Sequence, residues 1–232
     1  MSEPIHLDDF QIVPVLELEP GTFATQDRSF PYEEGKDQTN EEQQYWETCL
    51  EDSGITGLTP IKTGSWLVGV TSFSDLQLEQ YLHVIFDDWG GIDEVLGDLK
   101  NKPELHGGFA LLSQSGEVLI EPTCCSSLKD LVNWKAAAQN REAYWQELWV
   151  GHPWISTKYQ SSRLILSDYH EINTEISDRW GVHPQNLEQA IQNAEAELKD
   201  FSLRLKIILQ KWSLPTDITL LAKQLACIPD NG

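Results

Sequence analysis

Hydrophobic positions recur with the clearest rhythm toward the end of the chain. Between residues 187 and 212 they are spaced alternately four and three apart, at Leu187, Ile191, Ala194, Leu198, Phe201, Leu205, Ile208 and Trp212. This spacing puts them on one face of a long helix. The rhythm returns at Ile218, Leu221, Leu225 and Ile228, and the preceding Pro215 and Asp217 suit the first turn of a new helix. The pattern predicts a helical hairpin over residues 185–232, packed on the rest of the chain.

The apolar stripe of this hairpin has two alternative uses. It can pack on the sheet of its own chain, or it can pair with a second chain and act as an oligomerisation scaffold. The flanking positions lack the strong charge alternation that specifies coiled-coil partners. We therefore favour packing within the chain, and the sequence leaves the oligomeric state open.

A β-hairpin is predicted in the middle of the chain. Phe109–Leu112 and Val118–Ile120 are short apolar runs, and the connection between them contains Gly116. A short connection with a glycine near its end is typical of a hairpin built on a type I turn. Both runs are continuous rather than alternating, which favours strands buried on both faces or a central strand pair.

Two helices are predicted after this hairpin. Ser127 is followed three residues later by Asp130, and this near capping box indicates a helix start. Trp145 and Trp149 are four residues apart, so they are predicted to share one face of a second helix. Gly151 is interpreted as the residue that ends this second helix.

Shorter patterns predict the remaining elements. Helices are expected over residues 41–50 and from Ser74 or Asp75, and strands over residues 61–71 and 163–167. These elements and the hairpin are assigned to a core domain over residues 44–184.

Residues 1–43 are predicted to form a loosely structured, acidic arm. Residues 19–43 are rich in Gly, Pro, Asp, Glu and Thr, which is typical of a long surface loop. Residues 12–16 are apolar and suit a short strand. Pro14 within this run lacks an N–H donor, so a strand here is expected at a sheet edge.

The chain is strongly acidic, and the acid is concentrated in the first part of the sequence. The 232 residues carry a formal net charge of −21, and residues 1–52 hold 14 acidic residues against the two bases Arg28 and Lys36. Such a field repels nucleic acid and anionic membranes, and it steers basic partners toward the protein. Solubility alone is the alternative explanation of an acidic surface.

Neither a membrane segment nor an export signal is found in the sequence. There is no run of 18 apolar residues, and no basic segment followed by an apolar one at the start. The four cysteines include no CxxC spacing, which favours reduced thiols in a reducing compartment. We therefore expect a cytoplasmic protein that does not bind membranes.

Cys124 and Cys125 are the candidate nucleophiles. They precede a predicted helix, and the backbone N–H groups at a helix start favour a thiolate. Together with His152, or with His106 or His170, either thiol would suit a small thiol-dependent enzyme. We favour the alternative that both cysteines are small buried hydrophobic residues, which is the commoner role of cysteine.

Tryptophans and a pair of aspartates supply a candidate binding surface, which consists of Trp89, Trp145, Trp149, Trp154, Asp87 and Asp88. Tryptophan dominates interface hot spots, but its large apolar surface suits a protein core at least as well. The two aspartates lack the spaced oxygen ligands of a calcium loop. We expect a solvated turn there and assign no metal or cofactor. The sequence also contains no HExxH, GxSxG, P-loop or dinucleotide-binding motif.

The segment Pro122-Thr123-Cys124-Cys125-Ser126-Ser127-Leu128, with Trp134 downstream, resembles the bacterial immunity-type proteins of the SUKH superfamily. In that family a strand often ends in a short segment with Pro and Cys, followed by a capped helix that carries a Trp. Trp89-Gly90-Gly91 is similar to the family's Gly-Gly turn, which precedes a strand pair such as the predicted hairpin. The resemblance extends from about residue 82 to residue 169, so the acidic arm and the C-terminal hairpin lie outside it.

The resemblance implies an α+β fold with a central, mostly antiparallel sheet and packed helices. It also implies a non-catalytic role, the binding and neutralisation of a protein toxin, which is often a nuclease. The acidic surface of the chain would complement a basic face of such a toxin. From the sequence we therefore expect an intracellular protein-binding module rather than an enzyme, with the thiol-dependent enzyme as the alternative.

Overall fold

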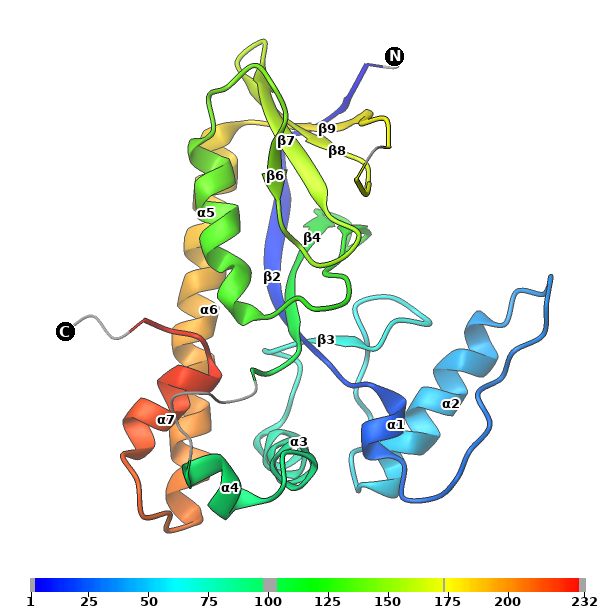
Figure 1. Ribbon diagram of the computed structural model, residues 1–232, viewed down its shortest axis with the longest axis vertical. Helices are drawn as coiled ribbons and strands as arrows, with labels where there is room; N and C mark the ends of the chain where they lie inside the picture. The colour runs from blue at the N-terminus through cyan, green and yellow to red at the C-terminus, as the bar shows by residue number, and fades with distance from the viewer. Residues whose placement is uncertain (1–2, 98–103, 173, 230–232) are drawn as a thin grey trace. The chain divides into compact units, whose positions relative to one another are not determined.

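The chain forms two compact units in the computed structural model, which describes residues 3–97, 104–172 and 174–229 (Figure 1). Unit 1 contains Met1–Val15 and His106–Leu198, and unit 2 contains Leu16–Leu105 and Lys199–Gly232. The backbone therefore passes between the units three times, once inside a strand, once at residues 105–106 and once inside a helix. These boundaries differ from the predicted division into an arm, a core domain and a C-terminal hairpin.

Unit 1 is built on a five-stranded sheet with the strand order β1-β9-β8-β7-β6. Its strands are β1 (Ile5–Leu7), β6 (Gln146–Leu148), β7 (Ile155–Gln160), β8 (Arg163–Ser167) and β9 (Asp178–Val182). β1 pairs with β9 in parallel and the other neighbours are antiparallel, so this sheet is mixed. The unit also holds β4 (Gly107–Ser113), β5 (Val118–Ile120), the 3-10 turn η1 (Leu128–Asp130) and helix α5 (Leu131–Gln139).

A second sheet has four strands in the order β3-β2-β4-β5. Its strand β2 (Phe10–Glu17) lies between β3 (Leu67–Gly69) and β4 and continues from unit 1 into unit 2. The prediction that Pro14 confines this segment to a sheet edge is therefore wrong. A proline removes only its own N–H donor, so the other residues of the eight-residue strand still pair.

The N-terminal arm is only partly loose. β1 and β2 give residues 5–7 and 10–17 regular structure, and Phe10 and Ile12 are buried. The short strand predicted over residues 12–16 is confirmed as part of β2, whereas the prediction of a loosely structured segment is wrong for β1 and the rest of β2, because alternate apolar positions in β2 bury one face of the strand. Residues 1–2 lie outside the described residues.

The predicted hairpin and the helix start after it are confirmed. β4 and β5 are antiparallel, with Leu111 opposite Ile120. β4 is largely buried, whereas β5 is the edge strand of its sheet, so only β4 is central. The Ser127 N–H donates to Asp130 Oδ2 at 2.9 Å, and the Lys129 N–H donates to Ser127 Oγ at 3.3 Å. This capping box starts η1, which leads into α5.

The predicted helix with Trp145 and Trp149 on one face is wrong. β6 occupies residues 146–148, so the two tryptophans flank a strand. Gly151 does not end a helix either. Its φ is +107°, and a Cβ at this position would overlap the carbonyl oxygen of Thr123. The close approach of two backbone segments therefore explains this glycine.

Unit 2 is largely helical. Its helices are α1 (Pro20–Phe23), α2 (Thr39–Asp52), α3 (Asp75–Asp88), α4 (Ile92–Gly97), α7 (Ile218–Leu225) and the second part of α6 (Pro184–Lys211). α3 begins at a capping box formed by Ser74 and Gln77, as predicted from Ser74. α2 is longer at both ends than the helix predicted over residues 41–50. α3 corresponds to the helix predicted from residue 75 and continues to Asp88.

The C-terminal helix pair is confirmed as α6 and α7. The apolar stripe of α6 is buried by the chain itself, and each of its members from Leu187 to Ile208 is at most 3% exposed. This supports the prediction of packing within the chain over pairing with a second chain. Among the helices of the described ranges, none is both long enough and apolar enough to cross a membrane. Residues 230–232 lie outside the described residues.

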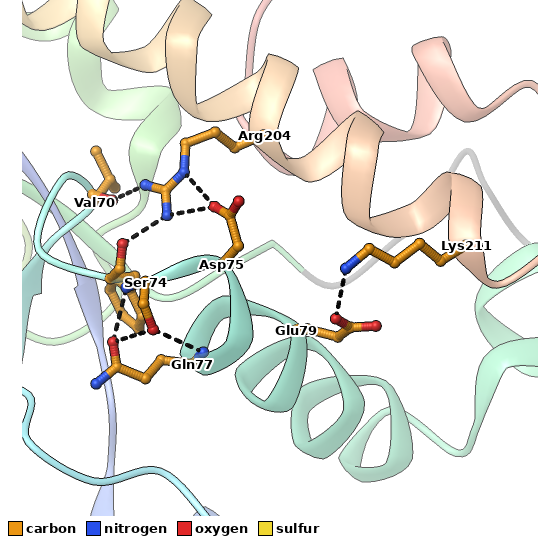
Figure 2. A network of polar contacts seen from close by, with 8 residues as sticks. Val70, Ser74, Asp75, Gln77, Glu79, Arg204 and Lys211 are labelled. Atoms are coloured by element: carbon orange, nitrogen blue, oxygen red, sulfur yellow. Dashed lines mark hydrogen bonds and ion pairs between the residues drawn. The ribbon is translucent and has the colours of Figure 1, made fainter.

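Polar contacts fasten the second part of α6 to the start of α3 (Figure 2). Arg204 Nε donates to Asp75 Oδ1 at 3.0 Å, while its two Nη atoms donate to the carbonyl oxygens of Val70 at 3.2 Å and Phe73 at 2.6 Å. Farther along α6, Lys211 Nζ donates to Glu79 Oε2 at 2.9 Å, and this bond lowers the pKa of Glu79. α6 is thus positioned by its charged side chains as well as by its buried apolar stripe.

The predicted α+β class is confirmed, with two sheets in place of one central sheet. The second sheet was not expected, because β2 and β3 join the predicted hairpin of β4 and β5 from distant parts of the sequence. Pairing between strands that are distant in the sequence produces no local sequence pattern.

Candidate functional site

Four aromatic side chains of unit 1 form one aromatic cluster, which consists of Trp149, His152, Trp154 and His170. The rings of Trp149 and Trp154 are stacked with centroids 6.0 Å apart. Trp154 also contacts the rings of His152 at 5.3 Å and His170 at 5.7 Å. Trp154 and His170 form an isolated β-bridge, so backbone pairing holds the cluster together. Both tryptophans are half-buried.

Cys124 and Cys125 are both exposed, so the favoured prediction that they are buried hydrophobic residues is wrong. Cys124 pairs with His152 in an isolated β-bridge. The Cys124 Sγ donates to the carbonyl oxygen of His152 at 3.2 Å. A nucleophilic thiol needs a base that accepts its proton. Here the thiol is directed at a backbone carbonyl and not at an imidazole nitrogen.

The two histidines of the cluster have different surroundings. His152 Nδ1 lies 3.8 Å from Glu171 Oε1, and both side chains are about half exposed, at 47% and 57%. His170 is buried, and its Nε2 is 2.9 Å from the Oγ of Ser156, which is only 3% exposed. The Ser156–His170 pair satisfies two buried polar groups, and its hydroxyl is closed to a substrate. His106, the third candidate, forms a β-bridge with Ser127.

The other sequence-predicted residues have separate contacts. Trp145 lies under Lys158, whose Nζ is 4.4 Å from the ring centroid. Asp87 and Asp88 are exposed in the last turn of α3, and Trp89, which follows them, stacks on Phe86 with centroids 5.7 Å apart. Across the described ranges, no group of three or more His, Cys, Asp and Glu side chains is arranged to hold a metal ion.

The exposed side of α2 was not predicted as a site, and it carries several negative charges. This helix of 14 residues has five acidic residues and no Lys or Arg. Glu41, Glu47 and Glu51 are exposed and form the acidic face of α2. Trp46, Cys49 and Leu50 are buried on the opposite side. The Trp46 indole N–H donates to the Leu18 carbonyl oxygen at 2.9 Å, which fixes the orientation of the helix.

Two charges of the acidic face, those of Glu47 and Glu51, do not stabilise their own helix. Glu47 and Glu51 are four residues apart, and like charges at this spacing repel one another. Both are near the C-terminal end of α2, where the helix dipole is negative and basic side chains are preferred. The last turn of α2 contains no basic residue. Within the described ranges, Glu47 accepts a hydrogen bond from Gln43 Nε2 at 2.9 Å, and no ion pair reaches either glutamate.

Asp52, the last residue of α2, differs from these glutamates because it has a basic partner. Arg28 donates to it from Nε at 2.9 Å and from Nη2 at 2.5 Å. The hydrogen bond from Arg28 holds the pKa of Asp52 below its ordinary value. The Thr25 N–H also donates to Oδ2, at 3.3 Å. This carboxylate is therefore used to fasten residues 25–28 to the helix.

A Schellman turn follows α2 and directs the chain back along the helix. The Gly54 N–H donates to the Glu51 carbonyl oxygen at 2.9 Å, and the Ile55 N–H donates to the Leu50 carbonyl oxygen at 3.0 Å. Gly54 has the positive φ, +77°, that this motif requires. Ile55 is fully buried after the turn. The turn thereby places the next residues beside the end of the acidic face.

The space between α2 and residues 55–59 is a pocket of about 320 Å³. Glu47 and Glu51 line it from the helix, and Thr56 and Thr59 line it from the loop. The loop wall of this acidic pocket is tied to α3, because Gln77 Nε2 donates to the Thr56 carbonyl oxygen at 2.6 Å. A second hollow, of about 490 Å³, borders the same helix near Glu41. The acidic face thus runs between two concave surfaces.

One local signal of this site is present in the sequence. Glu47 and Glu51 are one helical turn apart with no base between them, and Gly54 follows as a helix stop. The turn geometry that makes the opposite wall of the pocket is visible only in three dimensions.

Comparison of the chain with protein-family models, curated proteins and solved structures finds no match. The geometry and charge of the chain itself are therefore the basis for a functional proposal.

Proposed function

We propose that the chain is a non-catalytic protein-binding module whose acidic face on α2 binds a basic protein partner. The observation that carries this proposal is the uncompensated charge of Glu41, Glu47 and Glu51 on an exposed helix face. The carboxylates of Glu47 and Glu51 weaken their own helix by mutual repulsion and by their position near the negative end of its dipole. Basic side chains of a partner would replace the repulsion between these carboxylates, and their unfavourable interaction with the dipole, by attraction between opposite charges.

The charge of the whole chain supports the same partner class. A net charge of −21 creates a negative field around the protein. Such a field accelerates encounter with a basic partner, and this effect weakens as salt screens the charges. Binding is therefore expected to depend strongly on ionic strength.

Among basic proteins, a toxin is the partner that we propose, with the chain acting in the cytoplasm as its immunity protein. This part of the proposal is supported by the resemblance of residues 122–128, with Trp134, to the SUKH superfamily. Neutralisation of this kind requires no catalysis. The thiol of Cys124, which donates to a backbone carbonyl, and the buried Ser156–His170 pair are consistent with a non-catalytic role.

The proposal is tested by capture from the extract of the native cells with the tagged full chain. The matched variants are Glu47→Lys with Glu51→Lys on α2, and Asp93→Lys with Glu94→Lys on α4, which make the same change in net charge. We expect one basic protein to bind at low salt, to be released at high salt, and to bind the α2 variant at least about tenfold more weakly. Equal capture by the α2 variant and the wild type would exclude the acidic face as the binding surface.

The captured protein then permits a test of neutralisation. Its toxic activity, nuclease activity in the first instance, is measured with increasing amounts of the chain. Inhibition that saturates at equal amounts of the two proteins supports an immunity function. Full activity of the captured protein within the complex contradicts it.

A second candidate function, a small thiol-dependent enzyme, is favoured by one observation. Exposed Cys124 is paired with His152, whose ring lies near Glu171. Hydrolysis of a chromogenic ester such as p-nitrophenyl acetate by the full chain tests this function. Loss of hydrolysis in Cys124→Ser or Cys125→Ser would support it, whereas absence of hydrolysis, or equal rates in the variants, would contradict it.

A further inference from the structure

The acidic pocket at the end of α2 has the shape and the lining of a site for one cationic side chain. It is concave, and it is bounded by the helix on one side and by residues 55–59 on the other. Its acceptor groups come from both walls, with carboxylates of Glu47 and Glu51 opposite the loop residues Thr56 and Thr59. A cation in the pocket would therefore find oxygen acceptors on two sides.

The apolar residues beneath the pocket make it a fixed feature. Trp46 and Leu50 of α2 and Ile55 and Leu58 of the loop also line it, and each of them is less than 9% exposed. These side chains join the two walls through the core of unit 2. The pocket is thus formed before a ligand arrives, which lowers the entropic cost of binding.

The electrostatics of the pocket favour positive charge. The negative end of the α2 dipole adds to the charges of Glu47 and Glu51. No Lys or Arg is among the residues that line this pocket. Of the two bases among residues 1–52, Lys36 pairs with Glu33, and Arg28 is engaged by Asp52 in a two-bond ion pair. A positive charge from another molecule would compensate the carboxylates of Glu47 and Glu51.

The geometry of the lining favours a guanidinium over a metal ion. Calcium takes many oxygen ligands within a short distance, and in the described part of the chain no cluster of His, Cys, Asp and Glu is arranged for a metal. A guanidinium presents several N–H donors in a planar fork and matches acceptors that lie in different directions. A lysine ammonium is a compact point charge and has fewer donors.

We infer that the acidic pocket receives an arginine side chain of the basic partner protein. The inference rests on the proposed function and deepens it, because it names the residue type through which the partner contacts the acidic face. The carboxylates of Glu47 and Glu51 bind the guanidinium, and the methylene groups of the arginine lie between the helix and the loop. Charge complementarity between the pocket and the side chain supplies the specificity.

The test is an NMR titration of the isotopically labelled full chain at low salt. The probes are three short peptides, acetyl-Gly-Arg-Gly-amide, its lysine analogue, and its citrulline analogue, in which a neutral urea replaces the guanidinium. We expect the arginine peptide to cause saturable shifts of the backbone signals of residues 47, 51 and 56–59. The lysine peptide should bind more weakly and the citrulline peptide at least about tenfold more weakly.

Matched variants show whether the NMR shifts arise from binding at the acidic pocket. Glu47→Gln with Glu51→Gln should abolish the shifts, and Asp93→Asn with Glu94→Gln, which removes the same charge from α4, should preserve them. Shifts of equal size with citrulline, tighter binding of lysine, or shifts that persist in the α2 variant would each overturn the arginine assignment. A complete lack of shifts would do the same.

This experiment separates the two proposals. If the arginine peptide does not bind the pocket but the Glu47→Lys with Glu51→Lys variant still loses the captured protein, the proposed function stands and the pocket assignment falls. If neither the peptide nor a basic protein binds, both proposals fall.

Discussion

Arg28 holds Asp52 through two parallel hydrogen bonds, from Nε to Oδ2 at 2.9 Å and from Nη2 to Oδ1 at 2.5 Å. This bidentate geometry is the strong form of an ion pair between arginine and a carboxylate. This pair engages Arg28, one of the two bases among residues 1–52, and leaves Glu47 and Glu51 exposed to solvent. One carboxylate at the end of α2 is therefore structural, while its neighbours remain free for a partner.

The Arg28–Asp52 pair makes stability depend on pH in the acidic range. The hydrogen bond from Arg28 lowers the pKa of Asp52 in the folded chain, so ionised Asp52 favours folding above the ordinary aspartate pKa of about 4. This contribution is lost as the pH falls through the lowered pKa of the folded state. We expect the urea midpoint of the wild type to exceed that of Asp52→Asn at neutral pH, and the difference to shrink below about pH 4.

Arg28→Ala serves as the matched variant, since it removes the partner and leaves the carboxylate in place. It should also unfold at lower urea concentration at neutral pH and approach the wild type in acid. A difference between wild type and Asp52→Asn that stays constant down to acidic pH would show that this ion pair does not couple folding to proton binding.

Arg204 stabilises unit 2 chiefly through carbonyl oxygens. Its bonds to the Val70 and Phe73 carbonyl oxygens involve residues that are buried, whereas the Asp75 side chain is 66% exposed. We expect Arg204→Ala to lower the free energy of unfolding by about 2 kcal/mol. Asp75→Asn should cost less than about 1 kcal/mol, because exposed ion pairs contribute little. Urea unfolding followed by circular dichroism measures both, and equal losses would contradict this division.

Gly151 is expected to tolerate no side chain. Its positive φ strains any other residue, and a Cβ would overlap the backbone of Thr123. Gly151→Ala should therefore lower the free energy of unfolding by about 3 kcal/mol or more. Gly116→Ala is the control, because Gly116 also has a positive φ, +85°, but nothing lies within 4 Å of an added Cβ. The control should cost about 1 kcal/mol, and similar losses at both sites would show that the contact with Thr123 is unimportant.

The exposed thiols are not expected to contribute to partner binding. Cys124 and Cys125 belong to unit 1, and the acidic face belongs to unit 2. The double variant Cys124→Ser with Cys125→Ser should bind the captured basic protein within about twofold of the wild-type affinity, as measured by titration calorimetry. A loss of binding in this variant would move the binding surface to the aromatic cluster and its neighbours.

Elements with strong local signals were predictable from the sequence. The capping residues Ser74 and Ser127 start helices as expected, and the alternating spacing of apolar residues in α6 corresponds to a buried stripe. In contrast, β1 pairs with β9 through Ile5 and Trp180, which are far apart in the chain. A strand of three residues that pairs with a distant segment has no periodicity of its own, so neither β1 nor the mixed sheet was foreseen.

The candidate sites show the same division between local and distant information. Cys124 and His152 were both candidate catalytic residues from the sequence, and the structure pairs their backbones in a β-bridge. The direction of the thiol, toward a carbonyl oxygen, depends on that pairing and could not be predicted. The acidic pocket was missed because its second wall follows from the Schellman turn at Gly54.

The passage of α6 through both units has a consequence for synthesis of the protein. Unit 1 requires the helix up to Leu198, and unit 2 requires it from Lys199 onward. Multidomain chains generally fold from the N-terminus as each domain leaves the ribosome, but here neither unit is complete before α6 has emerged. The first 90 residues of unit 2 are synthesised well before its remaining residues, which begin at Lys199. The nascent chain therefore exposes apolar surface for most of translation, and chaperones that bind such surface are expected to matter for its yield.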